Sequence, residues 1–196
     1  HDVVNHVRKI TGVKRVGHGG TLDPLASGVL VIAVGRENTK QLEKYVKGEK
    51  EYVATLKLGY ESTTDDEEGE KTTIDNELKP KLTQIRQILK QFTGITEQTP
   101  PLYSAVKING KESYKYARRG KSVSIKPRMV KISKIDLLSY EYPYMILRVT
   151  TGRGVYIRSL ARDIGKKLST GAYLADLVRT RVNNFTLEIA LKLEEL

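Results

Sequence analysis

The chain of 196 residues is long enough for one well-filled domain, and its 34 Lys and Arg against 23 Asp and Glu give a formal net charge of +11 at pH 7, which favours a polyanionic partner. Charge alone does not name that partner, because a basic surface can also serve only solubility. The sequence contains no cysteine, which excludes disulfides and cysteine-based zinc sites, and its three histidines have no carboxylates at metal-ligand spacing, so we expect no metal. It also contains no recognisable signal peptide or transmembrane span, which predicts a cytoplasmic protein without membrane contact.

The chain opens with a predicted amphipathic helix. Apolar residues recur at helical spacing at Val3, Val4, Val7 and Ile10. Gly12 follows and is typical of a C-terminal helix cap. Because the sequence begins abruptly inside this helix, at His1, we expect that some N-terminal sequence is missing.

A glycine-rich segment with a single acid follows over residues 17–28. Its glycines permit backbone conformations that other residues avoid, and Pro24 keeps Asp23 out of a helix. The apolar run 29–34 comes next and predicts a buried strand that anchors the segment. The order helix, loop, strand excludes a dinucleotide fingerprint and a P-loop, both of which lead into a helix. From the residues alone, Asp23 is either a turn-forming residue or a displayed catalytic carboxylate.

The middle of the chain predicts a strand, a polar connection and a helix. Residues 51–58 alternate between apolar and polar side chains, as a half-buried strand requires, with Tyr52 near its start. The acidic, polar stretch 63–73 predicts a solvated loop or wide turn. Residues 82–92 carry apolar side chains at helical spacing and end near Gly94, which predicts a helix packed on a sheet.

Residues 97–127 differ in character and predict an arm-like insertion. Pro100 and Pro101 bar a helix, and the pair Asn109 and Gly110 is typical of a hairpin turn. A short basic helix is predicted over 113–119. Cationic and aromatic side chains are interspersed in the insertion: Tyr103, Lys107, Lys111, Tyr114, Lys115, Tyr116, Arg118, Arg119 and Lys121. This mixture indicates contact with RNA or DNA, although a solvated hairpin with tyrosines facing the core has the same composition.

The last third of the chain predicts two strands, two helices and a final strand. The strands cover 129–139 and 144–150, a helix begins near Tyr156, a short helix carries residues 173–178, and a strand covers 182–187. Strands and helices in irregular order, without a βαβ repeat, indicate an α+β fold with a mixed, largely antiparallel sheet. The residues alone therefore lead to a basic nucleic-acid-binding domain with an unusual acidic loop.

One segment indicates a specific family: residues 15–30, RVGHGGTLDPLASGVL, closely resemble the catalytic motif of the TruB family of tRNA pseudouridine-55 synthases. Three more segments match in order. EKEY at 49–52 resembles the tyrosine-bearing strand of the family, QTPPLYSAVK at 98–107 its thumb-like insertion, and GVYIRSL at 154–160 its third signature. LVR at 177–179 falls where the family has a later pocket-lining leucine, so the resemblance covers essentially the whole chain.

The resemblance implies one pseudouridine synthase catalytic domain over residues 1–196. The sheet would be flanked by helices, and residues 97–127 would be the RNA-binding, thumb-like insertion. Two departures stand out. Members of the family open with a strand and a Lys-Pro segment and close with an RNA-binding extension, and neither is found in this sequence. The triplet from His18 to Gly20 replaces a commoner His-Thr-Gly form and leaves His18 and Asp23 in register.

By resemblance, Asp23 is the nucleophile that isomerises uridine 55 in the T-loop of tRNA to pseudouridine, without a metal or cofactor. Whether it attacks C6 of the base or C1′ of the ribose stays open. Arg158 would pair with Asp23 and orient it. Tyr52, Tyr156 and Leu177 would border the uracil, and Tyr52 could also help to remove the C5 proton. The alternative for these three residues is ordinary core packing.

The same resemblance predicts how the RNA is held. The target uridine must be flipped out of the T-loop, and His18 would fill the vacated space or stack on the loop. Phosphate contacts are expected from Lys14, Arg15, Lys107, Arg118, Arg119 and Arg153. The expected partner is the T-arm stem-loop of tRNA. The protein is expected to act as a monomer and to need no protein partner.

Two rival functions remain. The guide-RNA-dependent rRNA pseudouridine synthase shares the Asp motif, but the insertion at 97–127 resembles the stand-alone tRNA enzymes. A non-catalytic RNA-binding or RNA-folding protein could keep the same fold. The intact set of Asp23, Tyr52, Tyr156 and Arg158 argues against such a loss of catalysis.

Overall fold

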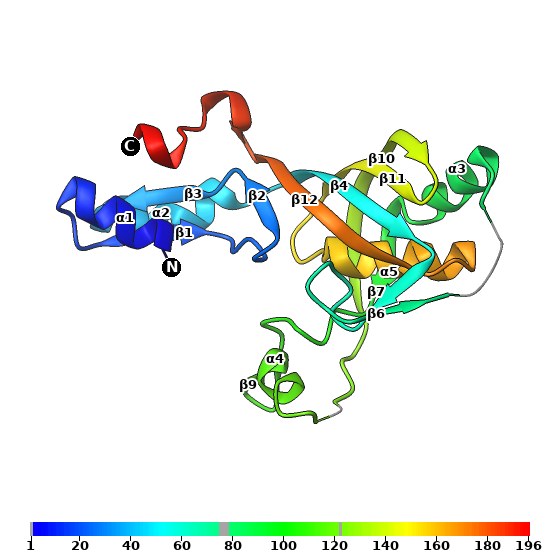
Figure 1. The fold of residues 1–196 in the computed structure, drawn as a ribbon. Helices are drawn as coiled ribbons and strands as arrows, with labels where there is room; N and C mark the ends of the chain where they lie inside the picture. Colours follow the sequence, from blue (N-terminus) through cyan, green and yellow to red (C-terminus); the bar gives the residue numbers. More distant parts are fainter. Residues whose placement is uncertain (1, 75–78, 122) are drawn as a thin grey trace.

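The computed structural model describes residues 2–74, 79–121 and 123–196 and is built around one seven-stranded sheet (Figure 1). Six strands follow the order β13, β12, β4, β11, β10, β7, and β2 pairs with β12. Their bounds are β2 (Ala26–Gly28), β4 (Lys50–Leu58), β7 (Gly94–Gln98), β10 (Arg128–Glu141), β11 (Tyr144–Thr151), β12 (Ala172–Val182) and β13 (Phe185–Thr186). Only the pairing of β2 with β12 is parallel in this sheet, so the predicted α+β class with a mixed, largely antiparallel sheet is confirmed.

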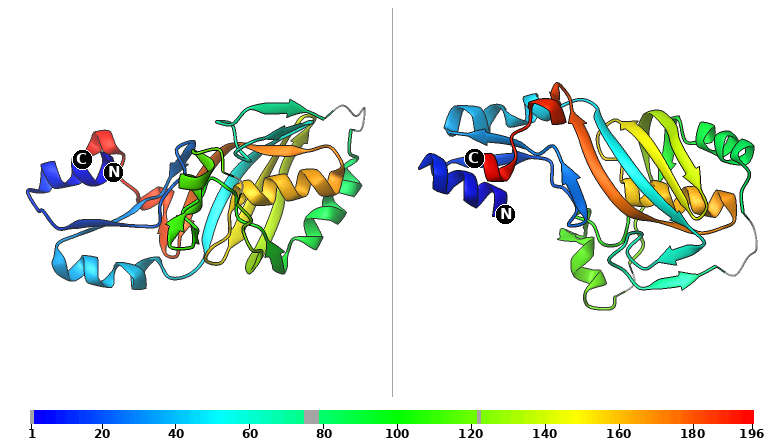
Figure 2. Two further views of the ribbon diagram at one scale, coloured as in Figure 1. Left: turned by 90° about the horizontal axis from the view of Figure 1, so that it is seen from below. Right: turned by 45° about the horizontal axis from the view of Figure 1, so that its top comes forward.

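Two helices cover one face of the sheet, α3 (Leu82–Gln91) and α5 (Ile157–Leu168) (Figure 2). Both helices and the strands contribute to one apolar core, which contains Leu56, Leu58, Ile85, Met145, Leu147, Leu160, Ile164 and Leu174. Each such side chain contributes about 1.5–3 kcal/mol to stability when fully buried. Along β4 the side chains of Ala54, Leu56 and Leu58 are buried while those between them are only half-buried, as the predicted alternation requires.

The N-terminal part forms a smaller lobe beside the sheet (Figure 1). It consists of α1 (Asp2–Thr11), β1 (Val16–Gly19), β3 (Val31–Val34) and α2 (Arg36–Val46), with β1 and β3 paired antiparallel. The predicted opening helix is confirmed, and Gly12 closes it with φ 68°. The apolar run 29–34 also contains the expected strand, although only its last four residues form β3. Among the described residues, no helix has the length and apolar character that crossing a membrane requires.

The predicted insertion protrudes from the body of the protein and carries a small hairpin and a helix (Figure 1). The elements are β8 (Lys107–Ile108), β9 (Lys111–Glu112) and α4 (Ser113–Ala117). Asn109 and Gly110 have φ 50° and 78°, as a two-residue hairpin turn with positive φ at both positions demands. The Asn-Gly signal and the short basic helix are thereby confirmed.

The helix predicted over 173–178 is wrong, because these residues belong to the long strand β12. The cause is a bulge. Leu174 lies opposite Leu56 and Leu177 lies opposite Ala54, so one extra residue of β12 falls between them. Two residues of the core face are therefore three positions apart, which imitates helical spacing. The strand predicted over 182–187 is shorter than expected, because β13 covers only Phe185–Thr186 and is followed by the 3₁₀ turns Leu187–Ile189 and Leu193–Glu195.

The polar stretch 63–73 is not merely a solvated loop. Its last residues form β6 (Lys71–Thr73), which pairs with β5 (Tyr60–Ser62). Asp66 at its centre is only 2 % exposed. A carboxylate at this depth needs a cationic or hydrogen-bonding partner, and that partner lies on α5.

Candidate active site

Asp23 and Arg158 form a two-point ion pair at the mouth of a cavity. Arg158 Nε lies 2.8 Å from Asp23 Oδ2, and Arg158 Nη2 lies 3.0 Å from Asp23 Oδ1. Asp23 sits in the loop between β1 and β2 with its side chain 33 % exposed, whereas Arg158 projects from the first turn of α5 and is buried. Such a pair fixes the plane of the carboxylate while one side of it stays open.

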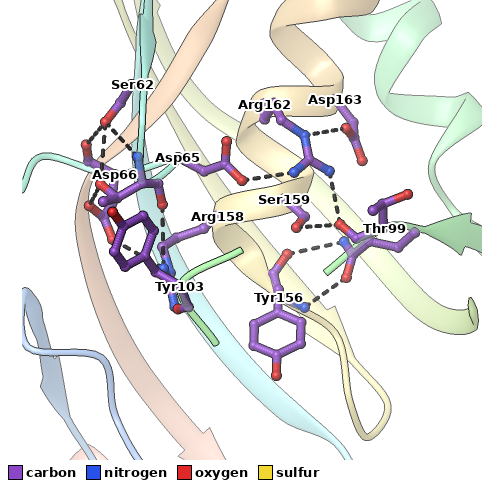
Figure 3. Close-up of polar contacts among 12 residues, drawn as sticks. Ser62, Asp65, Asp66, Thr99, Tyr103, Tyr156, Arg158, Ser159, Arg162 and Asp163 are labelled. Atoms are coloured by element: carbon purple, nitrogen blue, oxygen red, sulfur yellow. Dashed lines mark hydrogen bonds and ion pairs between the residues drawn. The ribbon is translucent and has the colours of Figure 1, made fainter. Parts of the chain in front are cut away.

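A second, buried carboxylate shares the same guanidinium (Figure 3). Arg158 Nη1 lies 3.4 Å from Asp66 Oδ2 and donates a 3.3 Å hydrogen bond to the Thr64 carbonyl, while Nη2 also donates to the Tyr103 carbonyl at 3.1 Å. Asp66 in turn accepts hydrogen bonds from the Thr64 hydroxyl and from the Glu68 amide. Arg158 is thus held from several sides and has little freedom to turn away from Asp23.

A parallel network lies one turn further along α5 (Figure 3). Arg162 Nη1 donates to Asp65 at 2.8 Å, Nε to Asp163 at 2.9 Å, and Nη2 to the Thr99 carbonyl at 2.9 Å. The Ser159 hydroxyl donates to the same carbonyl at 2.8 Å. Burial raises the pKa of Asp65, and the charge of Arg162 opposes this rise. The two networks tie both the polar loop and the base of the insertion to one helix.

The small cavity beside Asp23 has a volume of about 110 Å³. It is lined by four of the residues that the sequence predicted for substrate and catalysis, Asp23, Tyr52, Tyr156 and Leu177. A larger cavity of about 530 Å³ adjoins it, shares Asp23 and Tyr156, and is bordered on the far side by Tyr114 and Arg118 of the insertion. A flat ring that enters from the larger cavity would reach the smaller one past Asp23.

Tyr156 is fixed where the chain enters α5. Its backbone N–H donates to Gln98 Oε1 at 2.8 Å, and Gln98 Nε2 donates back to its carbonyl at 3.0 Å. Gln98 is buried at the end of β7, so this double contact sets where the helix begins. The guanidinium of Arg128 lies 5.1 Å from the centre of the Tyr156 ring, within cation–π range.

Sequence reasoning missed two site residues, Asp66 and Arg179. Asp66 was assigned to a solvated acidic run, whereas it contacts Arg158. Arg179 lines the small cavity directly opposite Tyr52 in the pairing of β4 with β12, and it is 2 % exposed. The sequence of β12 also contains Asp176 and Arg181, so nothing in it distinguishes Arg179 as the buried charge. Burial raises the pKa of Tyr52, and the neighbouring Arg179 opposes this rise.

His18 lies apart from the two cavities. It sits in β1 opposite Ile32, and neither cavity includes it among its lining residues. Its Nδ1 atom is buried and has no hydrogen-bond partner among the residues that the structure describes. The structure does not bring this imidazole to Asp23.

The six cations predicted to contact RNA fall in three regions. Lys14 and Arg15 are exposed in the loop between α1 and β1, and Arg153 is exposed before α5 and pairs with Glu43 at 3.1 Å. The other three lie on the insertion. Arg118 borders the larger cavity and lies 5.4 Å from the Tyr114 ring, whereas Lys107 and Arg119 face solvent. Of the six, only Arg118 lines the larger cavity.

Known proteins resemble this chain in sequence and in fold. Residues 8–157 match the family model described as TruB family pseudouridylate synthase (N terminal domain). The tRNA pseudouridine synthase B of Clostridium novyi is 44 % identical over 195 residues, which cover 100 % of this chain and 67 % of that protein. The protein of the same name from Nostoc sp. is 41 % identical over 199 residues, with the same two shares.

Among solved structures, the fold matches a chain of a Cbf5-Nop10-Gar1 complex with a TM-score of 0.72 and 33 % identity. That match covers 95 % of this chain and 46 % of the other. A chain from an H/ACA RNP bound to a substrate RNA containing 2′-deoxyuridine matches with a TM-score of 0.68 and 29 % identity, over 95 % of this chain and 44 % of the other. The chain thus spans less than half of these structural neighbours and about two thirds of the sequence relatives. Matches of this extent show that the chain belongs to the TruB family of pseudouridine synthases, which are isomerases.

Proposed function

We propose that this protein converts uridine 55 in the T-loop of tRNA to pseudouridine, with Asp23 as the nucleophile. The observation that carries the proposal is the two-point pair of Asp23 and Arg158 at a cavity walled by Tyr52, Tyr156 and Leu177. The carboxylate is oriented and partly exposed, and the two tyrosine rings and the leucine of the wall suit a flat base. The names of the sequence relatives support tRNA as the class of substrate.

The reaction begins when the target uridine leaves its stacked position and enters the cavity. Extrusion of a base costs a few kcal/mol, which contacts with the pocket and the RNA backbone offset. The larger cavity is the entrance, since it is open to solvent and is bordered by the insertion. His18, which lies apart from both cavities, fills the space that the base leaves in the T-loop or stacks on that loop, and the six cations named above contact the RNA phosphates.

The chemical steps rearrange one nucleotide and balance without a co-substrate. Asp23 adds to the uridine, at C6 of the base or at C1′ of the ribose, and the N1–C1′ bond breaks. The uracil turns within the pocket, C5 bonds to C1′, and the C5 proton leaves to a base, for which Tyr52, a lining residue of the cavity, is the candidate. The bond to Asp23 then breaks and restores the carboxylate. Arg158 holds Asp23 in place throughout these steps.

In this proposal residues 1–196 act as one catalytic domain, and residues 97–127 act as its RNA-binding insertion. The protein acts as a monomer in the cytoplasm. The basic insertion, with Arg118 stacked on Tyr114 at the cavity, supports direct contact with the RNA.

The deciding experiment uses T-arm RNA tritiated at C5 of the target uridine, without any guide RNA. Formation of pseudouridine releases the label into water, and Asp23→Asn is expected to abolish the release. No release from the unmutated protein overturns the proposal. Release that requires a guide RNA would favour the rival, guide-RNA-dependent function instead.

A further inference from the structure

Arg179 is a buried cation without a carboxylate partner. It is 2 % exposed on β12, and the ion pairs found among residues 2–74, 79–121 and 123–196 do not include it. A guanidinium stays charged at every physiological pH, and its burial is costly unless its N–H groups find acceptors. The free-energy cost of burying Arg179 therefore indicates a role beyond packing.

The Arg179 side chain joins the two ends of the segment that carries Asp23. Its Nε donates to the Val29 carbonyl at 2.7 Å, and its Nη2 donates to the Gly20 carbonyl at 3.1 Å. The backbone adds a further contact, because the Arg179 carbonyl accepts from the Val29 amide at 2.8 Å. One residue therefore fixes the chain on both sides of the carboxylate.

The Arg179 side chain also lies beside Tyr52 at the small cavity. Arg179 and Tyr52 are directly opposite each other on adjacent strands, so their side chains emerge on the same face of the sheet. Both side chains line the small cavity with Asp23, and the positive charge of Arg179 opposes the rise of the Tyr52 pKa that burial causes. Arg179 thereby connects two groups that act at different steps of the reaction proposed above.

We propose that Arg179 is a positioning residue, and this inference rests on the proposed function. It holds Tyr52 and the Asp23 segment in one fixed arrangement, with its charge beside the oxygen that accepts the C5 proton. After the C5–C1′ bond has formed, the C5–H bond breaks, its electron pair returns to the ring, and the proton passes to the Tyr52 phenolate and then to water. A cation beside the phenolate favours the form that can accept this proton. Burial raises the Tyr52 pKa, and removal of Arg179 would raise that pKa further.

The first test compares Arg179→Gln and Arg179→Lys with Arg181→Gln. Arg181 is a matched control, because it lies on the same strand, donates to the Asn183 carbonyl at 3.1 Å and does not line the cavity. Single-turnover pseudouridine formation is measured over a range of pH, together with the Kd for T-arm RNA.

Arg179→Gln is expected to slow the reaction by about 10- to 100-fold, as loss of a charge-assisted hydrogen bond does, with an unchanged Kd. It should also move the rise of the rate to higher pH. Arg179→Lys should keep the pH profile and lose part of the rate, and Arg181→Gln should change neither. A loss of rate without any displacement of the pH profile overturns the proposal.

The second test repeats the Arg179→Gln change in a Tyr52→Phe background. If Arg179 acts through Tyr52, Arg179→Gln should no longer displace the pH profile in the Tyr52→Phe background, and the loss of rate that it causes should be several-fold smaller. An equal cost in both backgrounds contradicts the inference.

The third test does not depend on activity. The ¹³C NMR signal of Tyr52 Cζ is assigned by its loss in Tyr52→Phe, and it should move in Arg179→Gln but not in Arg181→Gln. Should Arg179→Gln fail to fold, Arg179→Met, which also removes the charge, takes its place in this comparison. A protein that forms no pseudouridine refutes the proposed function, whereas an unmoved Tyr52 signal refutes the role of Arg179.

Discussion

The buried carboxylate of Asp66 offers a sharp prediction, because its substitution by asparagine changes a charge and hardly any volume. In Asp66→Asn the side-chain oxygen can still accept from the Thr64 hydroxyl and the Glu68 amide. The new NH₂ group then faces Arg158 Nη1, at the place where a carboxylate oxygen now lies 3.4 Å away. Two donors face each other, and one guanidinium loses one of its two carboxylates.

The expected loss of unfolding free energy depends on the contacts that Arg158 keeps in Asp66→Asn. Breaking an isolated buried ion pair costs about 3–5 kcal/mol, because a charge is left without a partner. Here Arg158 keeps both bonds to Asp23 and those to two carbonyls. The loss is therefore smaller than that of an isolated buried pair, about 1.5–3 kcal/mol of unfolding free energy for one interaction with a charged group. A guanidinium held from fewer sides also orients Asp23 less well, and a barrier higher by about 1.4 kcal/mol slows the reaction tenfold.

The assay combines urea unfolding with single-turnover release of tritium at saturating RNA. Glu70→Gln is the control, since it removes the same charge from an exposed position of the same loop. Asp66→Asn should lower the urea midpoint without changing the slope, slow tritium release about tenfold and leave the Kd for RNA unchanged. If Asp66→Asn matches Glu70→Gln in stability and in rate, the buried carboxylate does not hold Arg158 and the reasoning is wrong.

Three further predictions concern the fold, the insertion and pH. Gly28→Ala should lower the unfolding free energy by about 2–5 kcal/mol, because φ is 100° and a Cβ would lie 2.3 Å from a backbone oxygen of β12. Gly110→Ala, where φ is 78° and the space is open, should lower the unfolding free energy by about 1 kcal/mol, and equal urea midpoints for the two variants would contradict this prediction. Lys107→Ala combined with Arg119→Ala should weaken RNA binding and flatten its salt dependence. Filter binding that shows unchanged affinity at every salt concentration would mean that these two residues are solvated surface residues without a role in RNA binding. Burial raises the Asp65 pKa, so the folded state binds the Asp65 proton more tightly than the unfolded state does. The unfolding free energy should therefore fall as pH rises from the ordinary carboxyl pKa to the raised one. Urea midpoints measured across this range should show that Asp65→Asn removes the fall, and a pH profile unaltered by the substitution would refute the prediction.

The sequence allowed most elements to be predicted, because their burial follows a simple period. The amphipathic α1 and α5, the alternating β4 and the Asn-Gly hairpin each depend on local pattern or turn chemistry. Strand β12 did not obey this rule. Its bulge between Leu174 and Asp176 changes which face each residue takes, and such a bulge depends on the partner strand, which no local window contains.

The site shows the same division between local and distant information. The motif around Asp23 and the signature around Arg158 could be recognised from the residues themselves. Asp66 and Arg179 could not, since an acid in a run of acids and an arginine before a strand end are typical of solvated positions. Their burial follows from partners far along the chain, the Arg158 guanidinium for one and the carbonyls of Gly20 and Val29 for the other.

Helix α5 connects the insertion to the carboxylate pair. Arg158 binds Asp23 and the Tyr103 carbonyl with one guanidinium, and one turn later Arg162 and Ser159 hold the Thr99 carbonyl. Both carbonyls belong to the first residues of the insertion. A rigid helix transmits displacement rather than absorbing it, and hydrogen bonds weaken steeply once their angles change. In the proposed function, an RNA that binds the insertion would therefore also steady Arg158 and, through it, Asp23.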